Sequence, residues 1–190
     1  MILVMPTWRA WLEEKTKEEF RKSDYFEQYS QFLQNKELAE CLRENNVRLV
    51  FYIHPKFRDY LGEFNLNEES VEMIPFGTVP LNEIMMKCSM LITDYSSVCW
   101  DVYYMKKPVL FFQFDYDTYM ENHGSYMDME KELFGPRLTS CEDLIEAIKK
   151  LIGDGFAESE DAKAKRDYYF KYIDSDNSKR VYEFLKKEGY

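Results

Sequence analysis

Short, almost wholly apolar runs recur along the chain, separated by stretches whose apolar residues recur at helical spacing. Five runs predict strands, over residues 2–5, 49–53, 71–74, 90–93 and 109–112. Their apolar residues are consecutive rather than alternating, which is typical of strands that are covered on both faces. The runs therefore predict a parallel sheet between two layers of helices.

The segments between the runs carry the helical pattern. Helices are predicted over residues 24–45, 80–88 and 97–106 and, at the end of the chain, over about 178–187. A further helix follows a cap formed by Thr139 with Glu142 or by Ser140 with Asp143, and it stops at Gly153. Strands alternating with helices predict the α/β fold class: a Rossmann-like, doubly wound parallel sheet in a single domain over residues 1–190.

Two segments lack a clear period. Residues 10–23 are charged and fit either a loop or a helix. Residues 113–136 are rich in aromatic side chains, and a long aromatic segment after a strand favours a lid or a binding surface over a plain linker. The chain also starts inside a predicted strand, from which we expect it to be the back half of something longer.

Composition and charge exclude several classes of protein. The 190 residues include 25 Lys and Arg against 35 Asp and Glu, a net charge of −10, which argues against binding of duplex nucleic acid or anionic lipid through this chain. No run approaches the roughly 18 apolar residues of a membrane span. The four cysteines have neither C-x-x-C spacing nor neighbouring histidines, so we expect reduced thiols in a cytoplasmic protein and no metal site.

Polar side chains that suit a phosphate group follow three of the predicted strands. Thr7 and Arg9 follow the first, His54 follows the second, and residues 94–97 (Asp-Tyr-Ser-Ser) follow the fourth. Ligands of open parallel sheets bind beyond the carboxyl ends of the strands, where these residues are expected to meet. The sequence contains neither G-x-G-x-x-G nor G-x-x-x-x-G-K-[ST], so hydroxyl groups and backbone N–H groups would have to hold the phosphate.

Each candidate also has a plainer interpretation. Ser96 and Ser97 either donate to an anion or simply cap the following helix. His54, with an ordinary pKa near 6.5, is either a donor or acid at the ligand or one more polar residue, and His123 is interpreted as a loop residue. Arg9 either forks two phosphate oxygens or forms a surface ion pair.

The last predicted helix gives one more indication of an anion. Ser178 is its expected N-cap, and Arg180 lies in its first turn, against the helix dipole. A cation at the N-terminus of this helix is better explained if an anion binds both to Arg180 and to the helix N-terminus.

The motifs, in this order, resemble the CDP-glycerol glycerophosphotransferase family. They are residues 6–9 (Pro-Thr-Trp-Arg), 54–55 (His-Pro), 92–97 (Ile-Thr-Asp-Tyr-Ser-Ser) with Asp101 and Lys107-Pro108, 134–136 (Phe-Gly-Pro) and 177–181 (Asn-Ser-Lys-Arg-Val). The resemblance implies the C-terminal, donor-binding half of a GT-B architecture, with the N-terminal acceptor half absent from this chain. The long segment of residues 10–46 is more like the capsule-type branch of the family, which leaves glycerol phosphate and ribitol phosphate both open.

The resemblance also implies an activity. Glycerol phosphate would pass from CDP-glycerol, or ribitol phosphate from CDP-ribitol, to a hydroxyl of a cell-wall or capsular polymer, and CMP would leave. No cofactor and no metal is expected, and the isolated domain is expected to be inactive alone. The enzyme would be cytoplasmic, peripheral on the inner face of the membrane through its other half, without a transmembrane segment or a nucleic-acid partner.

The resemblance assigns roles to residues of this chain. His54 would neutralise or protonate the site of the leaving group. Ser96, Ser97 and the helix N-terminus behind them would hold phosphate oxygens of the donor, and Asp94 would belong to the same donor-binding site. Second-rank phosphate or ribose contacts would come from Thr7, Arg9, Ser178 and Arg180, and the base would lie at Pro75 and Phe76. The alternatives are a GT-B glycosyltransferase that uses a nucleotide sugar, and a non-catalytic nucleotide-binding domain that needs a partner.

Overall fold

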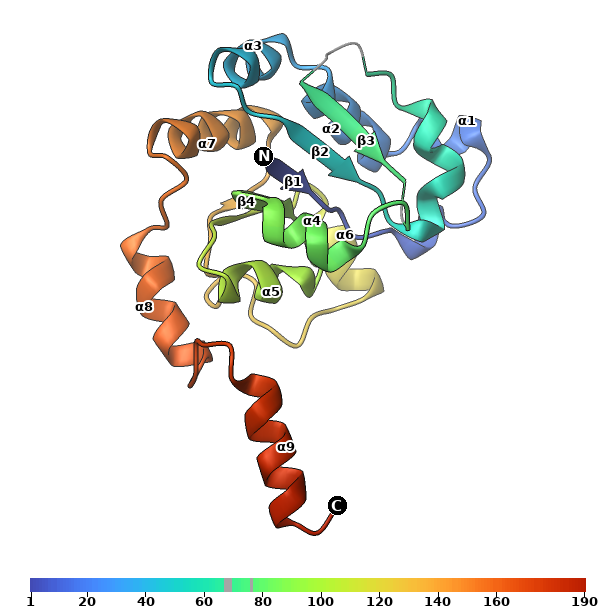
Figure 1. Cartoon of the computed structure of the whole chain (residues 1–190). Helices are drawn as coiled ribbons and strands as arrows, with labels where there is room; N and C mark the ends of the chain where they lie inside the picture. The colour runs from blue at the N-terminus through green and yellow to red at the C-terminus, as the bar shows by residue number, and fades with distance from the viewer. Residues whose placement is uncertain (67–69, 76) are drawn as a thin grey trace.

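The computed structural model describes residues 1–66, 70–75 and 77–190, so that Phe76 of the expected base site lies outside the described residues. Its centre is a six-stranded, wholly parallel sheet in the order β3-β2-β1-β4-β5-β6. Figure 1 labels the first four of these strands, β3, β2, β1 and β4. The strands are β1 (Ile2–Val4), β2 (Leu49–Tyr52), β3 (Val71–Ile74), β4 (Met90–Thr93), β5 (Val109–Phe112) and β6 (Arg137–Leu138). The predicted α/β, doubly wound parallel sheet is confirmed.

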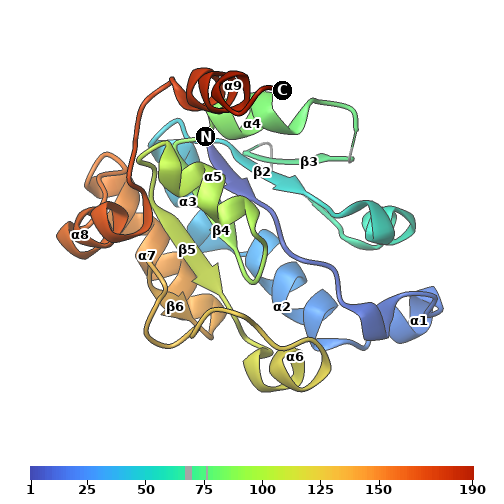
Figure 2. The same ribbon diagram turned by 90° about the horizontal axis from the view of Figure 1, so that it is seen from below.

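The sheet has an apolar core on each face, which explains the consecutive apolar runs. Along β1, Ile2 and Val4 belong to one core, and Leu3 with the following Met5 belongs to the other. Figure 2 shows helices on both sides of the sheet. The first core is completed by α2 (Asp24–Leu33), α3 (Lys36–Glu44) and α7 (Cys141–Gly153), and the second by α4 (Leu81–Lys87), α5 (Val98–Tyr104) and α8 (Glu160–Tyr169).

Several helices differ from the predicted pattern. The helix expected over 24–45 is two helices, because the side chain of Asn35 accepts a hydrogen bond from the Leu38 backbone N–H and starts α3 anew. Ser140, rather than Thr139, caps α7. The helices that were not predicted include three within the irregular segments 10–23 and 113–136 and one directly after β2. These are the 3₁₀ helices η1 (Ala10–Leu12) and η2 (Pro55–Glu63), and the α-helices α1 (Lys17–Phe20) and α6 (Tyr116–Asn122).

The last helix, α9 (Asn177–Lys187), projects away from the sheet and its helices (Figure 1). It has no buried residue. The residue at its N-cap position is Asp176, and the prediction that Ser178 caps it was therefore wrong. Among the described residues, none of the helices is both long enough and apolar enough to cross a membrane.

The Phe-Gly-Pro motif fastens the segment before β6 to the sheet. The ring of Phe134 stacks on Tyr103 of α5, with centroids 3.8 Å apart and planes inclined by 2°. At Gly135 the backbone approaches β5 so closely that a Cβ would lie 1.9 Å from the carbonyl oxygen of Val109. Only glycine fits there, which gives this motif a packing role.

Candidate functional site

A hollow of about 470 Å³ lies at the carboxyl edge of the sheet, where β1, β2 and β4 end. The order of the strands changes direction between β1 and β4, and doubly wound folds bind their ligands at such a switch point. Its walls include Thr7, Trp8, His54, Tyr95, Ser96 and Ser97. The structure thus brings four of the predicted site residues together, namely Thr7, His54, Ser96 and Ser97.

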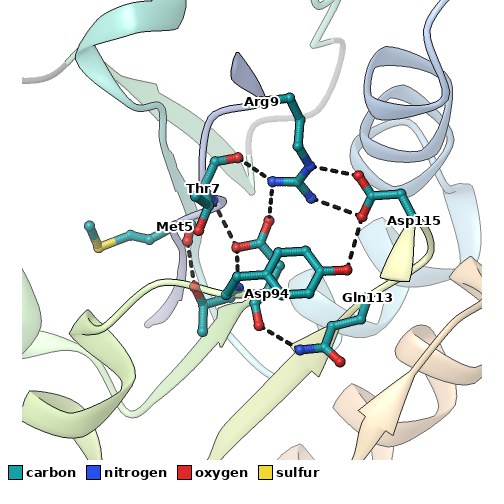
Figure 3. A network of polar contacts seen from close by, with 8 residues as sticks. Met5, Thr7, Arg9, Asp94, Gln113 and Asp115 are labelled. Carbon is teal, nitrogen blue, oxygen red and sulfur yellow. Dashed lines mark hydrogen bonds and ion pairs between the residues drawn. The ribbon is translucent and has the colours of Figure 1, made fainter. Parts of the chain in front are cut away.

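Asp94 ties together the turns that follow β1 and β4. One carboxylate oxygen, Oδ1, accepts hydrogen bonds from the backbone N–H groups of Thr7 at 2.8 Å and Tyr95 at 2.6 Å (Figure 3). The side chain is fully buried, and residue 94 is not part of the wall of the hollow. Asp94 therefore orients the two turns, in place of the direct donor contact that was expected of it.

Arg9 is fully buried and bound to two carboxylates. Its Nη1 lies 2.9 Å from Asp94 Oδ2, and its Nε and Nη2 lie 2.6 and 3.0 Å from the carboxylate of Asp115 (Figure 3). Burial alone would lower the pKa of Arg9, but Asp94 and Asp115 outweigh burial and raise it well above the usual value. The side chain is buried, which corrects the interpretation of Arg9 as a surface ion pair. Arg9 is not part of the wall beside His54, and its predicted phosphate contact stays a prediction.

The imidazole of His54 is held on two sides. Its Nδ1 accepts a hydrogen bond from the backbone N–H of Lys56 at 3.2 Å, and its ring stacks on Trp8 with centroids 5.9 Å apart. Burial, and then the charge of Lys56, lower the pKa of His54, while Glu13 opposes the shift. The neutral ring, with Nδ1 as acceptor, carries its hydrogen on Nε2, so His54 can donate a hydrogen bond there.

Three residues with hydroxyl groups, Thr7, Ser96 and Ser97, line the hollow. Ser97 occupies the N-cap position of α5, yet its side chain makes no capping hydrogen bond. The Ser96 hydroxyl accepts from the Val98 N–H only at 3.5 Å. Within the described part of the chain, Thr7 Oγ1 is buried and has no hydrogen-bond partner. Helix capping therefore explains little of the hydrogen bonding of the two serine side chains. The Thr7 hydroxyl is a buried polar group without a partner among the described residues, and such groups are rare in folded proteins.

The remaining predicted residues lie outside the wall of this hollow. The carbonyl oxygen of Pro75 accepts a hydrogen bond from the Thr78 hydroxyl at 2.8 Å. The Arg180 guanidinium binds Asp174 at 2.8 Å and lies over the ring of Tyr172, and the hydrogen bonds that it donates to Asp174 raise its pKa. Ser178 belongs to the exposed helix α9. The structure therefore does not bring Pro75, Ser178 and Arg180 to the hollow.

Aromatic rings around the hollow were not singled out from the sequence. Trp8 lies between both histidines, with His123 edge-on at 6.4 Å. Tyr95 stacks on Tyr119 of α6 at 3.6 Å. The signal was the aromatic content of residues 113–136, but sequence spacing did not show which rings would meet. Across the residues that the structure describes, no group of three His, Cys, Asp or Glu side chains is arranged to hold a metal ion.

Comparison with known proteins gives concordant matches. The family model described as CDP-Glycerol:Poly(glycerophosphate) glycerophosphotransferase matches residues 1–187. The minor teichoic acid biosynthesis protein GgaB of Bacillus subtilis (strain 168) is 26% identical over 193 residues, which are 97% of this chain and 21% of that protein. The teichoic acid poly(glycerol phosphate) polymerase of Bacillus spizizenii (strain ATCC 23059 / NRRL B-14472 / W23) is 31% identical over 189 residues, 97% of this chain and 44% of that protein.

A solved structure shares the fold. The wall teichoic acid polymerase TagF superposes with a TM-score of 0.70 and 24% identity, over 98% of this chain and 43% of that chain. The chain spans less than half the length of each of these relatives.

Proposed function

The chain belongs to the CDP-glycerol:poly(glycerophosphate) glycerophosphotransferase family, and from this premise we propose that its hollow binds the diphosphate of a CDP-activated polyol. As the donor-binding part of a longer enzyme, it would serve the transfer of glycerol phosphate from CDP-glycerol to a hydroxyl of a cell-wall or capsular polymer. The alternative transferred group is ribitol phosphate from CDP-ribitol, because the hydroxyl and imidazole groups proposed as ligands would contact the diphosphate, which both donors share.

One observation carries this proposal. Thr7, Ser97 and His54 line a single hollow at the switch point of the sheet. The Thr7 hydroxyl has no partner within the described part of the chain, and the Ser97 hydroxyl makes no capping bond. Hydrogen-bond donors that the fold does not use are suited to the oxygens of an anion.

The reaction is a displacement at phosphorus. An oxygen–phosphorus bond forms from the acceptor hydroxyl to the phosphorus that carries glycerol, and the bond from that phosphorus to the bridging oxygen of CDP breaks. The acceptor loses its proton to a base, and CMP leaves with the electron pair on the former bridging oxygen. Catalysis of such a step consists mainly of positioning and of stabilising the charge that develops on phosphate oxygens.

His54 would act as a neutral hydrogen-bond donor rather than as an acid. Protonation of Nδ1 would place its hydrogen against the N–H of Lys56, which now donates to that nitrogen. Burial and Lys56 also lower the pKa of His54, so the ring is neutral at pH 7. A neutral imidazole holds on to its Nε2 hydrogen but can stabilise negative charge through it, as donors of an oxyanion hole do.

In-line attack requires an acceptor hydroxyl held opposite the leaving CMP, and we propose that the remaining part of the longer enzyme supplies this together with the base. We further propose that the enzyme works in the cytoplasm at the inner face of the membrane. In support, the names of the two Bacillus relatives given above refer to teichoic acid biosynthesis and to a teichoic acid polymerase.

Nucleotide selectivity tests the proposal. CDP and CMP are expected to raise the melting temperature of the chain, and at 100 times Kd a ligand stabilises by about 2.7 kcal/mol. UDP is expected to act more weakly. An equal shift with UDP, CDP and GDP would leave an anion site but remove the cytidine assignment and favour a nucleotide-sugar enzyme. If no nucleotide shifted the melting temperature, both the anion site and the cytidine assignment would be wrong.

A further inference from the structure

Asp115 comes from the turn after β5, yet it binds the turn after β1. Its two carboxylate oxygens lie 2.6 and 3.0 Å from Nε and Nη2 of Arg9, a forked contact in which both hydrogen bonds point the same way (Figure 3). The Arg9 side chain is fully buried, and that of Asp115 is 7% exposed. Forked contacts of this kind fix orientation as well as distance.

The side chain of Arg9, held by Asp115, in turn contacts the backbone of Thr7. Its third nitrogen, Nη1, donates to the Thr7 carbonyl oxygen at 2.6 Å and lies 2.9 Å from Asp94 Oδ2. The same Asp94 carboxylate receives the Thr7 N–H. The backbone of Thr7 is thus held on both of its polar groups, and this fixes the place of Thr7 in the wall of the hollow.

A second contact reaches the serines. The Tyr95 hydroxyl donates to Asp115 Oδ1 at 3.1 Å, and the Tyr95 ring lies in the wall of the hollow directly before Ser96. Asp115 therefore contacts both turns that carry the proposed phosphate ligands, although it is not itself part of that wall. Burial, and then the charge of Asp115, raise the pKa of Tyr95, so its hydroxyl keeps its hydrogen.

Charge balance does not explain a second carboxylate here. Asp94 alone neutralises Arg9, and Asp115 leaves the group of three with a net charge of −1 beside a hollow proposed to hold an anion. Buried ion pairs add little stability over apolar packing, and their best-attested use is to specify one arrangement. What Asp115 adds is orientation.

We propose that Asp115 is a positioning residue of the donor site. Through Arg9 it sets the place of Thr7, and through Tyr95 it sets the place of the Ser96–Ser97 turn, without touching the donor. This inference rests on the proposed function, because the donor is taken to bind in the hollow.

The test compares three single variants with the wild-type chain. Asp115→Asn keeps the shape but loses the charge, and Tyr95→Phe removes only the hydroxyl that binds Asp115. Asp117→Asn, at an exposed position on the same helix, is the matched control. Three quantities are measured: the Kd for CDP by calorimetry, the hydrogen exchange of the Thr7 and Tyr95 amides, and the melting temperature.

We expect the Kd for CDP to rise about tenfold in Asp115→Asn, equivalent to about 1.4 kcal/mol. Exchange of the Thr7 and Tyr95 amides should quicken, because both donate to the carboxylate that Arg9 holds. Tyr95→Phe should weaken binding less, and the double variant by less than the product of the two single effects. Asp117→Asn should match the wild type.

Other outcomes separate the two proposals. If the wild type binds CDP and Asp115→Asn binds it equally well, the positioning role is wrong and the proposed function stands. If Asp115→Asn binds more tightly, the charge of Asp115 rather than its position matters, and the inference is again overturned. A wild type that binds no nucleotide overturns the proposed function and this inference with it. Should Asp115→Asn not fold, Tyr95→Phe still tests the contact between Asp115 and the turn of Ser96 and Ser97, and an unchanged Kd for CDP in that variant would overturn the inference.

Discussion

The indole ring of Trp8 lies against the imidazole ring of His54, with centroids 5.9 Å apart and planes inclined by 23°. The contact joins the turn after β1 to the turn after β2. Since Nδ1 of the same ring is taken by the Lys56 N–H, the ring has little freedom to turn, and Nε2 is the atom it can present to a ligand. Two predictions concern this ring.

The first prediction distinguishes a hydrogen-bond donor from an acid at His54. In the complete enzyme, His54→Ala should lower the rate of CMP release about a hundredfold, since loss of one donor to a developing oxyanion costs about that much. Donor affinity should change less, because the charge is larger in the transition state. His54→Gln keeps a donor and should retain a rate within about tenfold of the wild type.

The control for this prediction is His123→Gln, which alters a ring beside Trp8 that is not part of the wall of the hollow. It should leave the rate within a few-fold of the wild type. If His54→Gln proves as slow as His54→Ala, then His54 gives up a proton during the reaction, contrary to the proposal.

The second prediction concerns pH. The folded chain lowers the pKa of His54 through burial and Lys56, so the unfolded state binds the proton more readily. Stability from this group is therefore complete above the unfolded pKa of about 6.5 and falls as the pH drops through the folded pKa below it. His54→Gln should remove this part of the pH dependence. Melting curves of both proteins between pH 5 and 8 check it, and parallel curves would contradict it.

The strands and their shared edge were predictable because each β-strand is indicated by its own consecutive apolar residues. Residues 49–52 are consecutive apolar side chains, and they are buried on both faces as β2. The residues that follow such runs must meet at one edge, and this is how Thr7, His54 and the two serines were selected.

The network around Arg9 was not predictable in the same way. Its partners, Asp94 and Asp115, lie 85 and 106 residues after Arg9 in the sequence. The local sequence does not indicate which of the 35 acidic residues will contact it. A buried arginine and a surface arginine look alike in a sequence, because burial depends on what the whole fold brings to the side chain. Arg180 differs from Arg9, since its partner Asp174 is only six positions away in the sequence.

The third prediction separates ligand contact from helix capping. Replacing Ser96 and Ser97 together by Ala should raise the Kd for CDP at least about tenfold, since a hydrogen bond to a charged group contributes about 1.5–3 kcal/mol. The melting temperature should change little, because Ser97 makes no capping bond and that of Ser96 is long.

Ser159→Ala is the matched control for the serine pair. Ser159 caps α8 through a hydrogen bond from the Ala162 N–H at 3.1 Å, away from the hollow. Its replacement should lower stability by about 1 kcal/mol and leave the Kd unchanged. If the serine pair instead behaves like Ser159, losing stability but not affinity, capping is its role.

The fourth prediction uses two threonines whose hydroxyl oxygens are both buried and differ in their hydrogen bonding. The hydroxyl of Thr93 donates to the Met5 carbonyl oxygen at 2.7 Å, whereas that of Thr7 has no partner within the described residues. Valine replaces the hydroxyl by a methyl group of similar shape. Thr93→Val should therefore lower the free energy of unfolding by about 1 kcal/mol, the net contribution of a hydrogen bond.

Thr7→Val should do the opposite. It removes a buried hydroxyl that the fold leaves unsatisfied, so the free energy of unfolding should stay the same or rise by up to about 1 kcal/mol. The Kd for CDP should nevertheless rise about tenfold, because a hydrogen bond to a phosphate oxygen is lost. Urea unfolding and calorimetry on the two variants measure both quantities. A less stable Thr7→Val protein with unchanged affinity would mean that the hydroxyl serves the fold, and the phosphate contact would have to be assigned to other residues.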